Sequence, residues 1–178
     1  MYQARPNEGT RVNDSFDDFV VNRGPALLRF AYLLTGDRHR AEDLVQEVLA
    51  RVHQRWNRIE RAENAEFYVR TALVRQNISW WRRKSSRSEQ PVAEVPETTA
   101  DGSEQSLAAR DEMWGLLATL PRKQRAVLVL RFYEDLPDDR IAALLGCSTV
   151  SVRVQASRAL ARLRITLSDE NITTRRER

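Results

Sequence analysis

The stretch DDRIAALLGCSTVSVRVQASRALARLR, residues 138–164, decides the fold of the C-terminal part of the chain. Ile141, Leu144 and Leu145 have helical spacing, and Gly146 closes this short helix. A second apolar stripe with steps of three and four follows the turn: Val152, Ala156, Ala159, Leu160 and Leu163. Two helices joined by a tight turn that contains glycine are typical of a helix-turn-helix.

The face opposite the second stripe is expected to contact DNA. Its polar candidates, together with those at its border, are Ser148, Thr149, Ser151, Arg153, Gln155, Arg158 and Arg162. Hydroxyl and amide groups near a helix start suit base edges, and arginines suit phosphates. Ser148 is also a good N-cap. Val154 stands beside this face, where it could touch a thymine methyl or a sugar, or pack locally. The alternative interpretation is an amphipathic helix with a solvated basic face.

Further helices and a linker precede this motif. Apolar residues between Met113 and Leu120 predict a helix that ends before Pro121, and residues 122–133 predict another. We therefore expect a C-terminal helical domain over residues 108–167. Residues 89–107 lack hydrophobic periodicity and form the expected flexible linker. The tail, residues 168–178, is expected to be frayed.

The N-terminal block, residues 15–88, predicts a second small helical domain. Helices are expected over about 15–35, 38–57 and 64–85, with the first one ending at Thr35-Gly36 and Gly24-Pro25 as a place for a bend. The second helix carries a clear stripe with a period of 3.6 residues: Ala41, Leu44, Val45, Val48, Leu49, Val52 and Trp56. The third is expected to bury one face: Phe67, Val74, Ile78 and Trp81. The fold class is therefore all-α, with two domains.

Charge is segregated along the 178 residues, whose net charge is +4. Residues 15–88 contain 14 basic and nine acidic residues, and residues 113–167 contain nine basic and four acidic residues. Residues 89–112 between them contain one basic and seven acidic residues. Two basic blocks on either side of an acidic tether suggest two modules that face nucleic acid.

The segment NISWWRRKSSR, residues 77–87, combines aromatic, amide and cationic side chains. Its candidates for DNA contact are Asn77, Trp80, Arg82, Arg83 and Lys84. Trp80 can stack on an unpaired base, and the cations can neutralise phosphates. Alternatively, both tryptophans fill the core and the cations only satisfy the helix C-terminus. For Trp81 the core position is favoured.

An acidic patch interrupts the basic N-terminal block. Asp43, Gln46 and Glu47 share the exposed face of the expected second helix, which suits a basic protein partner better than DNA. The alternative is ordinary surface charge balanced by Arg40 and Arg51.

Several function classes are excluded or disfavoured. There is no apolar run of about 18 residues and no apolar N-terminal signal region, so a cytoplasmic protein is expected. The single cysteine, Cys147, excludes a disulfide framework and is expected to be a small buried residue. His39 and His53 lack ligand spacing, and no catalytic constellation stands out. We therefore expect no enzyme activity, no metal and no cofactor.

Taken together, four segments in this order resemble the sigma-70 family, in particular its extracytoplasmic-function (ECF) group and the actinobacterial SigE-like members. The segments are residues 30–56, 67–84, 120–136 and 138–164. The resemblance implies a sigma2-like bundle, a sigma4-like helix-turn-helix domain, and a transcription initiation factor for bacterial RNA polymerase. The chain departs from the family pattern at Pro137, Val150 and Val154, where a Ser or Thr cap, a Gly and a polar residue are common.

The resemblance also implies roles for the candidate residues. Asp43, Gln46 and Glu47 would dock on the clamp helices of the polymerase β′ subunit, and residues 120–136 would meet the β flap. The loop at about residues 58–65 would capture a base flipped from the −10 element, with Arg61, Glu63 and Asn64 as candidates. The segment with Trp80 would bind and melt −10 DNA, and the helix-turn-helix would read the −35 element. An anti-sigma factor is a further partner that such a protein could have.

Two rival functions are weighed against this one. A stand-alone helix-turn-helix regulator would bind palindromic operators without polymerase, but the N-terminal block shows no dimerisation or ligand-sensing pattern. A DNA-processing enzyme such as a recombinase would need a catalytic Ser or Tyr with supporting arginines, or a carboxylate metal site, and that block shows neither.

Overall fold

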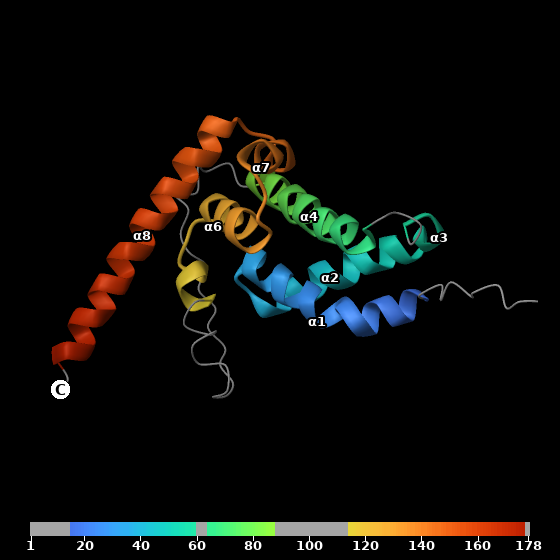
Figure 1. The fold of residues 1–178 in the computed structure, drawn as a ribbon, viewed down its shortest axis with the longest axis horizontal. Helices are drawn as coiled ribbons and strands as arrows, with labels where there is room; N and C mark the ends of the chain where they lie inside the picture. Colours follow the sequence, from blue (N-terminus) through green and yellow to red (C-terminus); the bar gives the residue numbers. More distant parts are fainter. Residues whose placement is uncertain (1–14, 60–63, 88–113, 177–178) are drawn as a thin grey trace, which may run out of the picture.

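The computed structural model describes residues 15–59, 64–87 and 114–176, with side chains described as far as Arg83 in the second range and Ser168 in the third. Every regular element in these ranges is helical (Figure 1). In chain order they are α1 (Phe16–Thr35), α2 (Arg38–His53), α3 (Trp56–Ile59), α4 (Ala65–Arg87), α6 (Arg122–Leu128), the π-helix η1 (Val129–Tyr133), α7 (Asp138–Leu145) and α8 (Thr149–Arg176). Residues 114–118 form a further short helical segment. The all-α prediction is confirmed.

Local capping explains where α1 and α2 begin and end. Ser15 and Asp18 form a reciprocal capping box at the start of α1. Gly36 adopts a left-handed conformation with a φ of 69° and ends the helix, as the sequence predicts. Asp37 then caps α2 by accepting a 2.8 Å hydrogen bond from the Arg40 amide. Pro25 lies inside α1 without ending it.

The apolar stripe of α2 is buried as predicted, but the helix is shorter than expected. It ends at His53, and Trp56 begins the separate turn α3. The Trp56 ring lies 5.4 Å from the Phe16 ring and 4.8 Å from the Phe19 ring, measured between centroids. The break between α2 and α3 therefore places this tryptophan against the start of α1.

Helix α4 completes the N-terminal domain by packing on both α1 and α2. Val74 and Ile78 are buried and Trp81 is partly buried, as the sequence predicts. The prediction for Phe67 is wrong, since this ring is 46% exposed. Val69 and Leu73 are buried instead, because α1 and α2 cover a wider face of α4 than one apolar stripe.

The C-terminal domain contains the predicted helix-turn-helix. Ile141 of α7 and Val152, Ala156 and Ala159 of α8 are buried together. Gly146 has a φ of 65° and closes α7. Pro137 precedes α7 and offers no side-chain cap to it.

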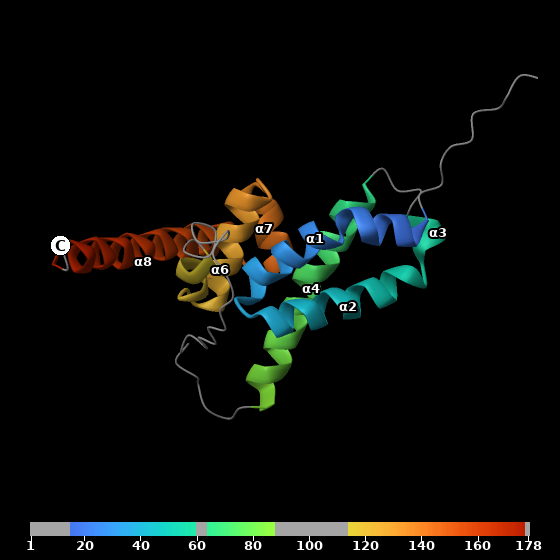
Figure 2. The same cartoon turned by 90° about the horizontal axis from the view of Figure 1, so that it is seen from below.

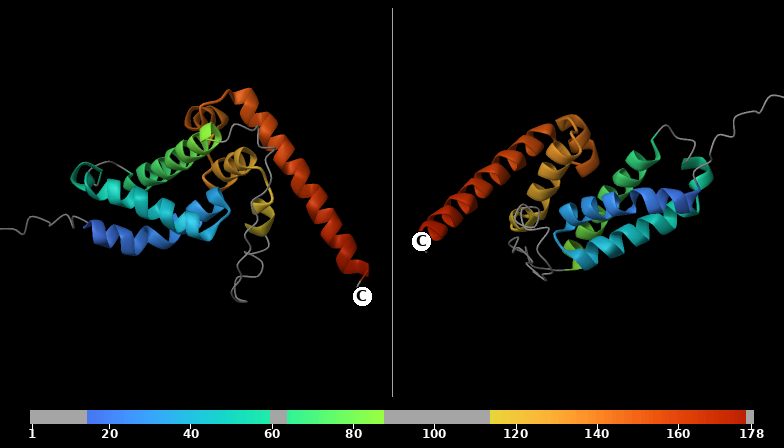
Figure 3. Two further views of the ribbon diagram at one scale, coloured as in Figure 1. Left: turned by 180° about the vertical axis from the view of Figure 1, so that it is seen from behind. Right: turned by 60° about the horizontal axis from the view of Figure 1, so that its bottom comes forward.

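Helix α8 is longer than the sequence analysis expected. It continues to Arg176 and projects from the rest of the molecule, so the prediction of a frayed tail from residue 168 is wrong (Figure 3). Neither Gly nor Pro occurs after residue 146 to end the helix. The hydroxyls of Thr166 and Ser168 donate to the carbonyls of Arg162 and Arg164, at 3.2 and 2.8 Å.

The two domains pack directly against each other, which the sequence did not reveal. Helix α1 contacts α6, and α4 contacts α7 (Figure 2). Phe30 stacks on Tyr133 with centroids 6.1 Å apart. Arg70 of α4 forms an ion pair with Glu134, which follows η1. Burial raises the pKa of Glu134, although the Arg70 charge opposes the shift.

Candidate nucleic-acid interface

The start of α8 is fixed by the serine that the sequence predicts as its cap. The Ser148 hydroxyl accepts a 3.1 Å hydrogen bond from the Ser151 amide and lies 2.9 Å from the Ser151 hydroxyl. The prediction of a Ser148 cap is therefore confirmed. The other amides of this first turn point along the helix axis and give its start a positive partial charge.

Asp138, at the first position of α7, positions a candidate DNA contact. Its carboxylate accepts a hydrogen bond of 3.1 Å from Arg153 Nε of α8 and another from Arg131 of η1. Burial alone would raise the pKa of Asp138, but these two arginines outweigh it and hold the pKa below its usual value. Sequence analysis missed both partners, since 15 residues separate Asp138 from Arg153 and only the folded turn brings them together.

The other candidates on the helix-turn-helix differ in exposure. Thr149 and Gln155 are half-buried, and the remaining predicted contacts are exposed: Ser148, Ser151, Arg153, Arg158 and Arg162. Val150 and Val154 are also exposed, at 64% and 40%. The reading face of α8 is therefore a mixture of polar, cationic and apolar groups.

The core position favoured for Trp81, near the end of α4, is confirmed. Both rings are half-buried, and Trp81 packs against the apolar core. The Arg40 guanidinium lies 3.6 Å from the centre of the Trp80 ring, and that of Arg122 lies 5.4 Å away. Such stacking of cations on an indole is the same geometry that a nucleic-acid base would need.

The remaining candidates on α4 need one correction. Arg82 and Arg83 are exposed, but Asn77 is only 3% exposed, because α2 covers this face of α4. The expectation of Asn77 as a surface group is therefore wrong for this conformation. The side chain of Lys84 lies outside the described part of the chain.

A hollow of about 220 Å³ between α2 and α4 joins the acidic patch to Trp80. Asp43, Glu47, Asn77 and Trp80 are among the residues that line it. Asp43, Gln46 and Glu47 are exposed, as predicted. Arg51 donates hydrogen bonds of 2.8 Å to Glu47 and 2.7 Å to Gln76, which ties the patch to α4.

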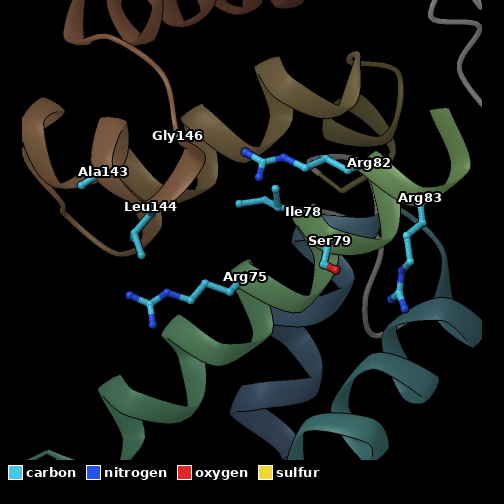
Figure 4. A pocket seen from close by; sticks show the side chains of 8 residues that line it. All are labelled: Arg75, Ile78, Ser79, Arg82, Arg83, Ala143, Leu144 and Gly146. Atoms are coloured by element: carbon cyan, nitrogen blue, oxygen red, sulfur yellow. The ribbon is translucent and has the colours of Figure 1, made fainter. Parts of the chain in front are cut away.

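Two larger hollows lie between the domains. Figure 4 shows the first, of about 620 Å³, into which Arg75 and Arg82 point from α4 toward Leu144 and Gly146. The second, of about 690 Å³, is lined by Trp81 and Arg82 on one side and by Ser151 and Gln155 on the other. In this conformation the two predicted DNA-binding elements thus face each other.

Cys147 also lines the second hollow and is exposed, so the prediction of a buried cysteine is wrong. The turn between α7 and α8 places it at the edge of the small C-terminal core, where no further element of its own domain covers it.

The predicted loop before α4 is described only in part. Arg61 and Glu63 lie outside the described residues. Asn64 accepts a 2.8 Å hydrogen bond from the Phe67 amide, which caps the first turn of α4 and fixes the position of this side chain.

Within the described ranges, no group of three or more His, Cys, Asp and Glu side chains is placed to hold a metal ion. No described helix is both long enough and apolar enough to cross a membrane.

Comparison with known proteins identifies the family of the chain. The family profile "Sigma-70 region 2" matches residues 19–87, and "Sigma-70, region 4" matches residues 110–163. The RNA polymerase sigma-E factor of Streptomyces coelicolor is 37% identical over 160 residues, which cover 90% of each chain. The chain belongs to the sigma-70 family. Its sigma2 domain contains α1–α4, and its sigma4 domain contains the helix-turn-helix.

Further relatives place the chain in the ECF group of sigma factors. The ECF RNA polymerase sigma factor ShbA of Streptomyces griseus is 34% identical and matches 83% of this chain and 84% of its own length. A solved structure of the sigma factor RpoE in complex with the anti-sigma factor NepR, from Bartonella quintana, is similar with a TM-score of 0.59 and 25% identity, over 87% of this chain and 98% of that one. The chain is thus an RNA polymerase sigma factor, which binds core polymerase and recognises promoter DNA.

Proposed function

We propose that this sigma factor uses three surfaces to bind its partners. The first surface docks on core polymerase. Asp43, Gln46 and Glu47 form an exposed acidic face on α2, within a domain that is otherwise basic. An acidic patch of this kind complements a basic protein surface and repels DNA. We assign it to the clamp helices of the β′ subunit, and residues 120–136 to the β flap.

The second surface, at the end of α4, binds the −10 element and starts its melting. Trp80 provides a stacking platform, while Arg82 and Arg83 provide charge for phosphates. Flipping a base costs a few kcal/mol, comparable to one or two stacking contacts. An opened strand that reaches Trp80 is therefore favoured over the closed duplex. The loop before α4, with Arg61, Glu63 and Asn64, would capture the flipped base.

The third surface, the N-terminal half of α8, reads the −35 element in the major groove. Ser151, Arg153 and Arg158 are exposed there, and Asp138 holds Arg153 in place. The remaining predicted contacts are assigned to the same groove and its phosphates: Ser148, Thr149, Gln155 and Arg162.

The protein is proposed to act in the cytoplasm, where core polymerase is, and to have no catalytic activity of its own. An anti-sigma factor is a proposed additional partner, since the relative from Bartonella quintana was solved in complex with one. Such a partner would control access to the surfaces above.

The observation that carries this proposal is the separation of charge on the sigma2 domain, with acidic side chains on α2 and cations with Trp80 on α4. The test is binding of core polymerase by the wild type, by Asp43→Arg/Glu47→Arg and by Asp17→Arg, which reverses an exposed charge in the first turn of α1. We expect the double variant to lose most binding and promoter-dependent transcription, and the Asp17→Arg control to retain both. Normal binding by the double variant would refute the docking assignment.

A further inference from the structure

The outermost row of the recognition helix is apolar. Val150 and Val154 are 64% and 40% exposed and lie four residues apart, in the first two turns of α8. Residues four apart share a face of a helix, about 6 Å apart along its axis. Val154 is two positions from the buried residues Val152 and Ala156, which places it about 200° around the helix from each of them. It therefore points directly away from the core.

The surroundings of the two valines are polar and positively charged. On the helix surface, Arg153 lies to one side of them, and Ser151 and Arg158 lie to the other, all exposed. Such a row, with cations on its flanks and methyl groups along its centre, matches the major groove, which has phosphate walls and base edges on its floor. The C5 methyl of thymine is the apolar group that a base edge presents in that groove.

We propose that Val150 and Val154 read thymine methyl groups in the −35 element, so that they set the base preference of this sigma factor at one or two positions. The inference rests on the proposed function, in which α8 enters the −35 major groove. It adds the chemical feature that is read, a methyl group, and the two residues that read it.

The arrangement of the domains leaves this row accessible. Ser151 and Gln155 line the hollow that faces α4, whereas Val150 and Val154 lie on the exposed side of the same turns. Two more exposed apolar residues of α8, Ile165 and Leu167, are too far along the helix to share the groove. Ile165 is 15 residues beyond Val150, or about 22 Å along the axis. It serves as a matched control.

The test replaces thymine by deoxyuridine, one position at a time, in a −35 element selected from a promoter library with the holoenzyme. This change removes only the methyl group and keeps every hydrogen-bonding group of the base. We expect the wild-type holoenzyme to bind one or two of the substituted promoters roughly threefold to tenfold more weakly, as for the loss of about one buried methyl group. Ile165→Ala is expected to show the same sensitivity as the wild type.

Each of the variants Val150→Ala and Val154→Ala is expected to lose part of the discrimination between thymine and deoxyuridine, at the position that its valine reads, because alanine makes a smaller apolar contact. Both changed side chains are exposed, and circular dichroism of each variant checks that it folds. The inference is overturned if the wild type does not distinguish the promoters, or if the alanine variants keep the full discrimination. A holoenzyme that selects no promoter at all would refute the proposed function itself.

Discussion

Trp80, the proposed stacking platform for an unpaired base, already has cations stacked on its ring. Its half-buried ring is covered on one face by the Arg40 guanidinium at 3.6 Å, with Arg122 of the other domain at 5.4 Å. A base that stacks on this ring has to displace or share these cations. Cation stacking contributes about 0.5–1 kcal/mol at exposed sites and about 2 kcal/mol at desolvated ones, whereas a stacked base contributes about 1–3 kcal/mol, so a base can compete for the ring.

We expect Trp80→Ala to slow the formation of the open promoter complex by roughly fivefold to 100-fold, the range for the loss of one base-stacking contact. Trp80→Phe should retain most of the rate, because it keeps an aromatic face. Permanganate reactivity of −10 thymines, followed over time with the holoenzyme, measures the effect. Core binding by each variant is the control, and an unchanged rate for Trp80→Ala would exclude stacking on this ring.

Asp138 makes a pH-dependent contribution to the stability of the sigma4 domain. The pKa of its carboxyl is lowered in the folded protein, so its ionised form is stabilised by folding. This contribution is complete above the unfolded pKa of about 3.9 and is lost as the pH falls through the lower folded value.

Asp138→Asn should therefore lower the thermal midpoint at pH 7, and the gap to the wild type should narrow as the pH is lowered toward 3. Thermal unfolding followed by circular dichroism at several pH values gives this gap. Asp139→Asn, which changes the neighbouring exposed carboxylate in the same helical turn, should have a smaller effect. A gap that stays constant with pH would show that the ion pairs of Asp138 do not stabilise the fold.

At the scale of helices, local signals predict the elements and tertiary contacts decide their limits. The stripe of α2, the stop at Gly36 and the turn at Gly146 depend on neighbouring residues, so the sequence predicts them correctly. The exposure of Phe67 and Cys147 depends on which helices pack over them, and the local sequence pattern does not predict this packing. Helix α8 continues beyond residue 168 because neither Gly nor Pro follows residue 146 to end it. The sequence analysis expected a frayed tail and gave this absence no weight.

Gly36 ends α1 and also lies against Arg125 of the C-terminal domain. Its φ of 69° suits glycine, and a Cβ there would overlap the guanidinium of Arg125. Arg125 is buried and donates hydrogen bonds of 2.9 and 3.0 Å to the carbonyls of Ala118 and Leu120. Burial, together with the nearby charges of Arg122 and Arg40, lowers the pKa of Arg125 to about 10.

We expect Gly36→Ala to lower the free energy of unfolding by at least about 1–2 kcal/mol, the cost of the left-handed conformation alone. Gly115→Ala is the matched control, since its helical site has no atom within 4 Å of a new Cβ and should gain up to about 1 kcal/mol. Urea unfolding of both variants gives the comparison. Equal stability of Gly36→Ala and the wild type would contradict the close contact with Arg125.

At the scale of the whole molecule, the main finding is that the two elements predicted to bind DNA lie against each other. Charge distribution predicts two basic modules and a tether, and the sequence pattern correctly predicts the Ser148 cap. It cannot predict that Arg40 and Arg122 stack on Trp80, or that Ser151 shares a hollow with Trp81, because these contacts join distant parts of the chain. We expect promoter binding by both elements at once to require the domains to separate.

The Arg70–Glu134 ion pair is expected to help hold this closed arrangement. Glu134→Lys places a second cation beside Arg70 and should open the interface. The only cysteine, Cys147, can carry a bimane dye, whose fluorescence is quenched by a nearby tryptophan, and Trp81 lines the same hollow. We expect brighter fluorescence in Glu134→Lys than in the wild type, and no change in Asp17→Arg. Equal fluorescence in all three proteins would mean that this ion pair does not hold the domains together.

The most direct test of the sigma-factor assignment is transcription in vitro with purified actinobacterial core RNA polymerase and a library of promoter templates. We predict that core polymerase alone does not initiate specifically, and that addition of the protein produces start sites that share one −35 and −10 pair. Asp43→Arg/Glu47→Arg should abolish these transcripts. Specific binding of the free protein to palindromic DNA, without any initiation when core polymerase is added, would contradict a sigma factor and favour a stand-alone regulator.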